Sequence, residues 1–99
     1  MIRGTTPTLE FEIPFETSLI EAAWVTLSQY RAVVVDKQLS DCKCIGKTLS
    51  VRLTQEETLK LSCDCETEIQ IRVRTLAGDA LASDIIKVDT ERILRDGVI

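Results

Sequence analysis

The sequence predicts an all-β domain, because apolar residues recur at every second position and turn-forming residues follow at short intervals. The clearest example is the segment Ile69-Gln-Ile-Arg-Val. Alternation with a period of two is typical of a strand with one buried and one solvated face. Gly78-Asp79 comes next and favours a chain reversal into a run rich in β-branched residues at 80–88. A β-hairpin is therefore expected here.

Four more segments carry a strand pattern in the first half of the chain. They are Thr8–Phe15, Ala22–Gln29, Ala32–Lys37 and Thr48–Leu53. The first is expected to be an edge strand that ends at Pro14, because proline has no N–H group to donate to a sheet. The three adjacent valines of the third predict that both of its faces are covered at that point.

The start of the second of these segments allows two interpretations. Ser18 followed by Glu21 fits the N-terminal cap of a helix. The strand interpretation, from about Ala22, is favoured because alternation and β-branching decide short runs. Trp24, the only tryptophan, is expected to be a core or sheet-face residue and not a platform for a ligand.

The connections between these segments complete the expected architecture. Tyr30-Arg31 is expected to be a turn, and residues 39–46 a loop or an irregular edge. Thr54 and Glu57 have the spacing of a capping box, which predicts one helical turn that carries the chain from one sheet to the other. The whole predicts an immunoglobulin-like β-sandwich of about seven short antiparallel strands with one single-turn helix, as a single domain over residues 1–99.

Composition narrows the range of functions. The chain has 99 residues, 44% hydrophobic and 28% charged, and a formal net charge of −4. This charge argues against a nucleic-acid partner, since phosphate contacts require clustered Lys and Arg. No apolar run approaches the ~20 residues that cross a membrane, so no membrane partner is expected. The first residues lack the apolar core of a signal peptide, and synthesis in a reducing cytoplasm is expected.

Two Cys-x-Cys pairs are the one specific chemical feature, formed by Cys42, Cys44, Cys63 and Cys65. Residues i and i+2 of a strand share a face. If the two pairs were neighbours at one end of the sandwich, four sulfurs could bind zinc tetrahedrally, although structural zinc sites more often have about two to four residues between paired ligands. The alternatives are free thiols in a reducing compartment and a disulfide between the pairs in an oxidising environment.

The sequence offers little for catalysis. Histidine is absent, which removes Ser–His and Cys–His activation and helical histidine zinc sites. The acidic pairs Glu10/Glu12 and Glu56/Glu57 have the positions of a solvated strand face and a helical turn. We therefore expect no enzymatic activity and no cofactor other than the zinc considered above.

Four segments resemble small uncharacterised proteins encoded in phage and prophage regions of Gram-positive bacteria. They are Met1–Thr8, Leu53–Leu59, Ile69–Arg74 and Arg92–Ile99. The expected strand–turn plan is also similar to that of the immunoglobulin-like N-terminal domains of phage baseplate and tail proteins. The resemblance implies a virion or tail-assembly component whose partners are other tail or baseplate proteins, or further copies of itself. It also implies synthesis in the cytoplasm of the bacterial host, with the virion as a second location.

The C-terminal segment Asp89–Ile99 keeps apolar residues that a disordered tail would lack. Ile93 and Leu94 are expected to fold back and close one end of the core. Val98 and Ile99 are expected to add to an edge strand of a neighbouring copy, as in β-augmentation.

Overall fold

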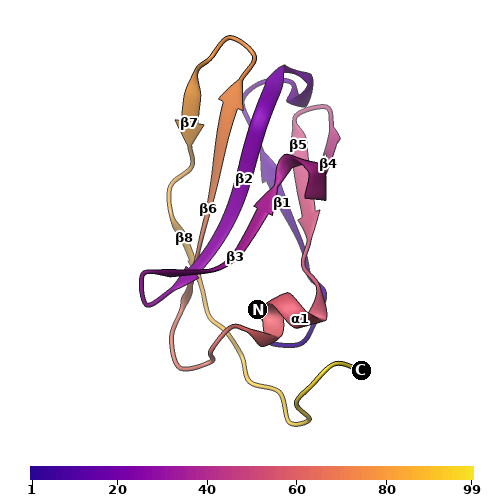
Figure 1. Cartoon of the computed structure of the whole chain (residues 1–99), viewed down its shortest axis with the longest axis vertical. Helices are drawn as coiled ribbons and strands as arrows, with labels where there is room; N and C mark the ends of the chain where they lie inside the picture. Colours follow the sequence, from indigo (N-terminus) through magenta and orange to yellow (C-terminus); the bar gives the residue numbers. More distant parts are fainter.

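Two antiparallel β-sheets pack face to face in the computed structural model, which describes all residues 1–99 (Figure 1). In chain order the elements are β1 (Thr8–Glu12), η1 (Thr17–Leu19), β2 (Ile20–Gln29), β3 (Ala32–Gln38), η2 (Leu39–Asp41), β4 (Cys42–Ile45), β5 (Thr48–Arg52), α1 (Gln55–Leu59), β6 (Thr67–Thr75), β7 (Ala80–Ala82) and β8 (Ile86–Val88), where η marks a 3₁₀ helix. The predicted all-β sandwich is confirmed.

The two sheets differ in width. The small sheet has three strands in the order β1-β5-β4, and the large sheet has five, in the order β3-β2-β6-β7 with β8 also paired to β6. β7 pairs with Arg72–Arg74 and β8 with Thr67–Ile69, so both lie along one edge of β6. The large sheet therefore extends further than the small sheet that covers it.

The core lies between the sheets and consists of apolar side chains from both. Its buried members are Ile20, Ala23, Val25, Leu27, Val35, Leu49, Val51, Leu53, Leu61, Ile69, Ile71 and Val73. On β6 the buried positions alternate with polar ones, as the sequence predicts. Trp24 lies on the outer face of β2 and is 42% exposed, which confirms a sheet-face position.

The predicted capping box begins α1 between β5 and β6, and so connects the two sheets. The Glu57 backbone N–H donates to Thr54 Oγ1 over 3.2 Å, and the Thr54 N–H donates to Glu57 Oε1 over 2.9 Å. Lys37 Nζ on β3 lies 2.8 Å from the same Glu57 oxygen. One carboxylate thus caps the helix and attaches it to the large sheet.

A buried polar network joins the end of β2 to the connection between α1 and β6 and to the segment after β8. Gln29 Nε2 donates to the Ser62 carbonyl over 2.8 Å and to Thr67 Oγ1 over 3.1 Å, and Gln29 Oε1 accepts from the Ser62 N–H over 2.7 Å. The hydroxyls of Thr67 and Thr90 are 2.6 Å apart. Gln29, Thr67 and Thr90 are all buried, and no buried side-chain N or O atom lacks a partner.

The terminal segments run side by side below the sheets. Ile2 and Glu91 form a parallel bridge. The Glu91 N–H donates to the Met1 carbonyl over 2.7 Å, and the Arg3 N–H donates to the Glu91 carbonyl over 3.1 Å. These two segments close the end of the sandwich where α1 lies (Figure 1).

The tight turn between β2 and β3 is conformationally unusual. Tyr30 has φ of 53° and Arg31 has φ of 62°, and neither is glycine. Positive φ at both central residues of a two-residue hairpin is the type I′ arrangement, which favours Asn-Gly. The predicted turn is confirmed, in a conformation that its residues disfavour.

Several expectations about strands need correction. Residues 42–45, expected to be a loop or irregular edge, form strand β4 against β5. The run 80–88 forms two strands: the Ser83 N–H still donates to the Ile71 carbonyl, but the Ile71 N–H donates to Ser83 Oγ in place of a backbone carbonyl. Val33 is 63% exposed and Val35 is buried, so only one face of the valine run is covered. The register shift opposite Leu27/Ser28 turns Val33 away from the core that holds Val35.

The C-terminal expectation is met only in part by Ile93, which folds back but is not among the residues packed against the core, and it is wrong for Leu94. Ile93 is partly buried, and its Cδ1 would lie 3.1 Å from a Cβ built on Gly4, so it lies against the N-terminal segment. Leu94 is 91% exposed and takes no part in the core, because the chain turns away from the sheets after Ile93. Val98 and Ile99 are also exposed, and their addition to a neighbouring copy stays a prediction.

Candidate functional site

The two cysteine pairs lie on different elements. Cys42 and Cys44 are on β4, opposite Val51 and Leu49 of β5. Since those partners point into the core, both thiols are on the inner face of the small sheet, as expected for positions i and i+2. Cys63 and Cys65 lie in the connection between α1 and β6.

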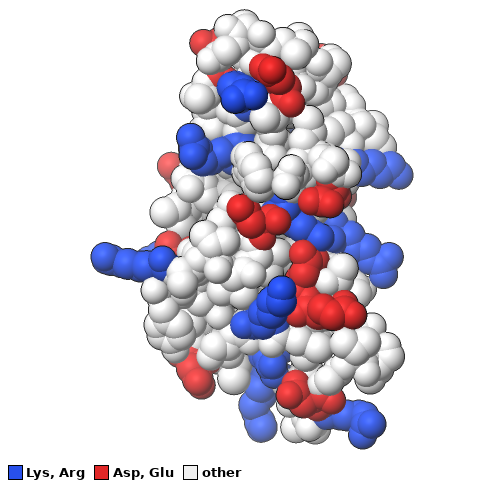
Figure 2. Space-filling view, viewed as in Figure 1, with Lys and Arg blue, Asp and Glu red and all other residues white.

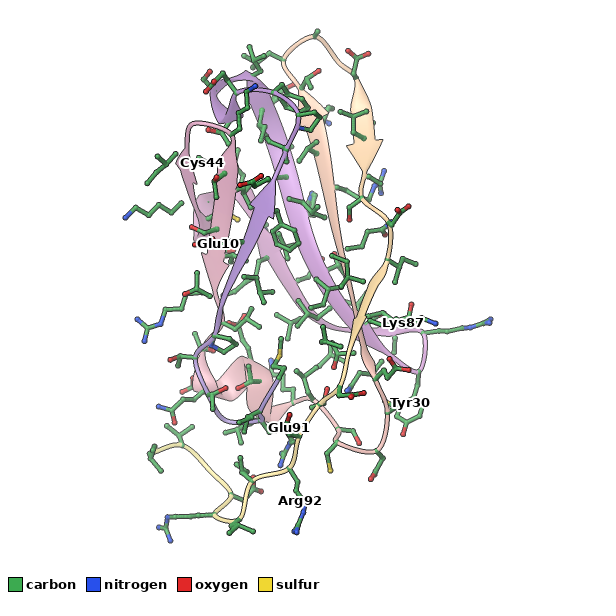
Figure 3. All side chains as sticks on the ribbon, turned by 180° about the vertical axis from the view of Figure 1, so that it is seen from behind. Glu10, Tyr30, Cys44, Lys87, Glu91 and Arg92 are labelled. Atoms are coloured by element: carbon green, nitrogen blue, oxygen red, sulfur yellow. The ribbon has the colours of Figure 1, made fainter.

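The structure does not bring the four sulfurs together. All four thiols are free, and no group of three or more His, Cys, Asp or Glu side chains could hold a metal ion. Figure 3 places Cys44 toward one end of the sandwich and Tyr30, the neighbour of Cys65, toward the other. Zinc binding stays a prediction from the spacing of the cysteines alone, because this arrangement of the four thiols does not form the site.

The thiol of Cys42 is poorly reactive at neutral pH. Burial, then the neighbouring Cys44 and Asp41, raise the pKa of its thiol from 9.0 to about 11, and Lys37 opposes the shift. Its Sγ donates to the Gln38 carbonyl over 3.3 Å. A thiol with this pKa holds almost no thiolate at neutral pH and is a poor nucleophile.

Cys65 lies beside the strained turn. A hydrogen bond with Cys65, together with the charges of Cys65 and Asp64, raises the pKa of the Tyr30 hydroxyl. Tyr30 is 73% exposed, so the ring stands in solvent at the tip of the β2–β3 hairpin. The arrangement supplies no base or electrophile for a reaction.

A second candidate site lies at the open side of the sandwich, where the segment after β1, including η1, faces the end of β6 and β7. Figure 3 views the molecule from this side: β1 crosses in front of the large sheet, and β7 and β8 lie along the right-hand side of the view. Two adjoining hollows of about 570 and 290 Å³ lie here, and both are lined by Phe15 and Leu81. We call this surface the edge groove, defined by Ile13, Phe15, Leu19, Leu76 and Leu81.

The edge groove is apolar and partly open to water. Leu19 is 49% exposed, Leu76 65% and Leu81 45%. Leu81 stands opposite Val73 on the inner face of the large sheet, where no strand of the small sheet covers it. Exposed apolar side chains that gather in a concave surface are typical of binding sites.

The edge of β1 beside the groove has no strand partner. The Ile13 N–H and the Pro7 carbonyl both bond toward β5. Because successive residues of a strand point their backbone groups to opposite sides, the N–H and C=O groups of Thr8, Glu10 and Glu12 face the free edge. The groove therefore adjoins this row of unpaired backbone groups at its Glu12 end, since Glu12 lines one of the two hollows.

The charged side chains around the edge groove are acidic. Asp79 and Glu12 are the charged residues that line the hollows, and Glu10 and Glu16 are exposed on the β1 side. On the face drawn in Figure 2, in contrast, Lys and Arg side chains lie among Asp and Glu side chains.

No family model matches this chain, and neither does any curated protein or solved structure. No helix in the structure is both long enough and apolar enough to span a membrane. The class that the fold defines is thus an all-β sandwich of two antiparallel sheets with one open side.

Sequence reasoning missed the edge groove. Leu76 and Leu81 flank the predicted Gly78-Asp79 turn, and apolar residues beside an exposed turn were the available signal. The unequal width of the sheets could not be inferred, because pairing between strands is not visible in a single sequence.

Proposed function

We propose that this chain is a non-enzymatic structural or protein-interaction module of a phage or prophage tail or baseplate. The observation that supports an interaction role is the edge groove, where exposed apolar side chains adjoin the free edge of β1. Unpaired sheet edges are sites for adding a strand from another chain, and natural proteins protect those that are not used. The tail or baseplate context rests on the resemblance of four segments to phage and prophage proteins.

The partners in this proposal are other tail or baseplate proteins, or further copies of the chain. A partner that covers Leu19, Leu76 and Leu81 removes apolar surface from water, which contributes about 25 cal/mol for each Å² buried. Hydrogen bonds to Thr8, Glu10 and Glu12 would add direction and register, because backbone pairing fixes how two strands align.

The first experiment measures association of the intact chain. Light scattering at micromolar concentrations reports self-association, and pull-down with purified products of the adjacent genes reports partners. Leu81→Arg places a charge in the edge groove and is expected to abolish the complex. Val33→Arg is the matched control, because Val33 is an exposed apolar residue of β3, at the opposite edge of the large sheet.

The outcomes are distinct. Loss of the complex in the Leu81 variant alone supports an interaction role through the edge groove. A strict monomer that binds none of the adjacent gene products at micromolar concentrations contradicts the proposed function. Equal loss in both variants would place the interface elsewhere.

A further inference from the structure

The edge groove occupies the place of a missing strand. The small sheet has three strands and ends at β1, while the large sheet continues past it to β7 and β8. A strand beside β1 would lie over the inner face of β6 and β7, the face that carries Val73 and Leu81. Strand spacing within a sheet is about 4.8 Å, so one added strand extends the small sheet across this side.

The surroundings of that place specify the side chains of its occupant. Successive side chains of a strand point to opposite faces. Those directed inward would meet Phe15 and Leu81 and must be apolar. Those directed outward would stand beside Glu10 and Glu12 on the solvent face of β1, where opposite charges stabilise cross-strand pairs.

The same charges disfavour a second copy that pairs through its own β1. An antiparallel β1–β1 pair would set glutamates of one copy opposite or diagonal to those of the other. Like charges directly opposite one another destabilise a sheet. No Lys or Arg lines the edge groove to offset them.

From these observations we infer that the edge groove binds an extended segment of a partner protein in which apolar residues alternate with Lys or Arg. The segment pairs with the free edge of β1 as the fourth strand of the small sheet. This inference rests on the proposed interaction role and gives it a partner chemistry. Since β1 has five residues, the contact spans about 17 Å and directs two or three apolar side chains inward.

Synthetic peptides test the chemistry directly. The probe is a fluorescein-labelled peptide of about seven residues in which Lys and Val alternate. One control peptide carries Glu in place of Lys, and a second keeps Lys but carries Ser in place of Val. Fluorescence anisotropy with the intact chain is expected to show the Lys-Val peptide binding about tenfold more tightly than either control.

Variants of the chain assign the binding to the edge groove. The double substitution Glu10→Lys and Glu12→Lys is expected to reverse the charge preference, so that the Glu-Val peptide binds more tightly. Leu81→Arg is expected to weaken binding of the Lys-Val peptide, and Val33→Arg is expected to leave it unchanged. Hydrogen exchange measured by NMR is expected to slow at the amides of Glu10 and Glu12 when the Lys-Val peptide is bound.

The results separate this inference from the proposed function. Absence of binding up to about 1 mM, or equal binding of the Lys and Glu peptides, overturns the inferred partner. If the chain instead self-associates, and deletion of Gly97–Ile99 or the Leu81 substitution abolishes that, the groove holds a second copy. The interaction role then stands while this inference fails. A chain that neither self-associates nor binds any adjacent gene product or peptide contradicts both.

Discussion

Replacing Gln29 by alanine should destabilise the domain strongly, because the buried side chain of Gln29 joins the end of β2 to two other segments. Gln29 makes three hydrogen bonds inside the buried network, two of them with the backbone of Ser62. Each contributes about 1 kcal/mol to stability, and the N–H and C=O groups of the half-buried Ser62 lose their partners. The expected loss is about 3 kcal/mol, against a total of about 5–15 kcal/mol for a domain of this kind.

Urea unfolding followed by circular dichroism measures this loss. The midpoint should fall while the slope of the free energy against urea stays the same, because the surface exposed on unfolding is unchanged. The melting temperature should fall by about 12–24 °C, at about 4–8 °C for each kcal/mol. Gln70→Ala is the control, since Gln70 is half-buried and its side chain donates one hydrogen bond, to the Ser83 carbonyl.

A loss of less than about 1 kcal/mol for Gln29→Ala, equal to that of the control, would refute the reasoning. It would mean that water takes over the hydrogen bonds of the Gln29 side-chain amide without a loss in the free energy of unfolding. The network would then be a consequence of packing between the connections and not a cause of it.

Three further predictions concern charge, backbone and thiol. Burial opposes ionisation of Glu57, but its hydrogen bonds with Lys37 and Thr54 lower its pKa below the ordinary 4.5. The ionised carboxylate therefore contributes stability above pH 4.5, and this contribution is lost as the pH falls through the lowered pKa. Urea unfolding at several pH values should show that the free energy of unfolding falls less steeply with acid in Glu57→Gln, and an equally steep fall would contradict this. The double substitution Tyr30→Asn and Arg31→Gly should raise the free energy of unfolding by about 1–2 kcal/mol, because Asn and Gly adopt the positive φ of these two positions with less strain. Calorimetry that finds no gain would count against strain in the turn. At pH 8 iodoacetamide should modify the exposed Cys44 well before Cys42, whose pKa is about 11. Mass spectrometry of the digested peptides measures the two rates of modification, and equal rates would disprove the burial of Cys42.

Local patterns in the sequence account for the parts of the fold that local physics decides. The alternation at Ile69–Val73 predicts both the strand and its buried face, because the period of two is a property of the strand itself. Thr54 and Glu57 predict the helix start, because both partners of the capping box lie within one turn.

The remaining features depend on pairing between distant segments. Cys42–Ile45 becomes a strand because β5 provides the partner, although its own residues show no clear alternation. The break at Ser83 arises from a bond to Ile71, twelve positions earlier. The edge groove follows from the number of strands in each sheet, which no single segment encodes.

The parallel bridge between the terminal segments determines how the domain carries mechanical load. Residues 1–3 and 89–91 run in the same direction and are joined by backbone hydrogen bonds. Tension applied at the two ends of the chain pulls these segments along their length in opposite directions. The bonds between them are then sheared together, whereas an antiparallel hairpin pulled from its open end ruptures one bond at a time. Stretching the domain by residues 1 and 91 therefore requires these bonds to break together.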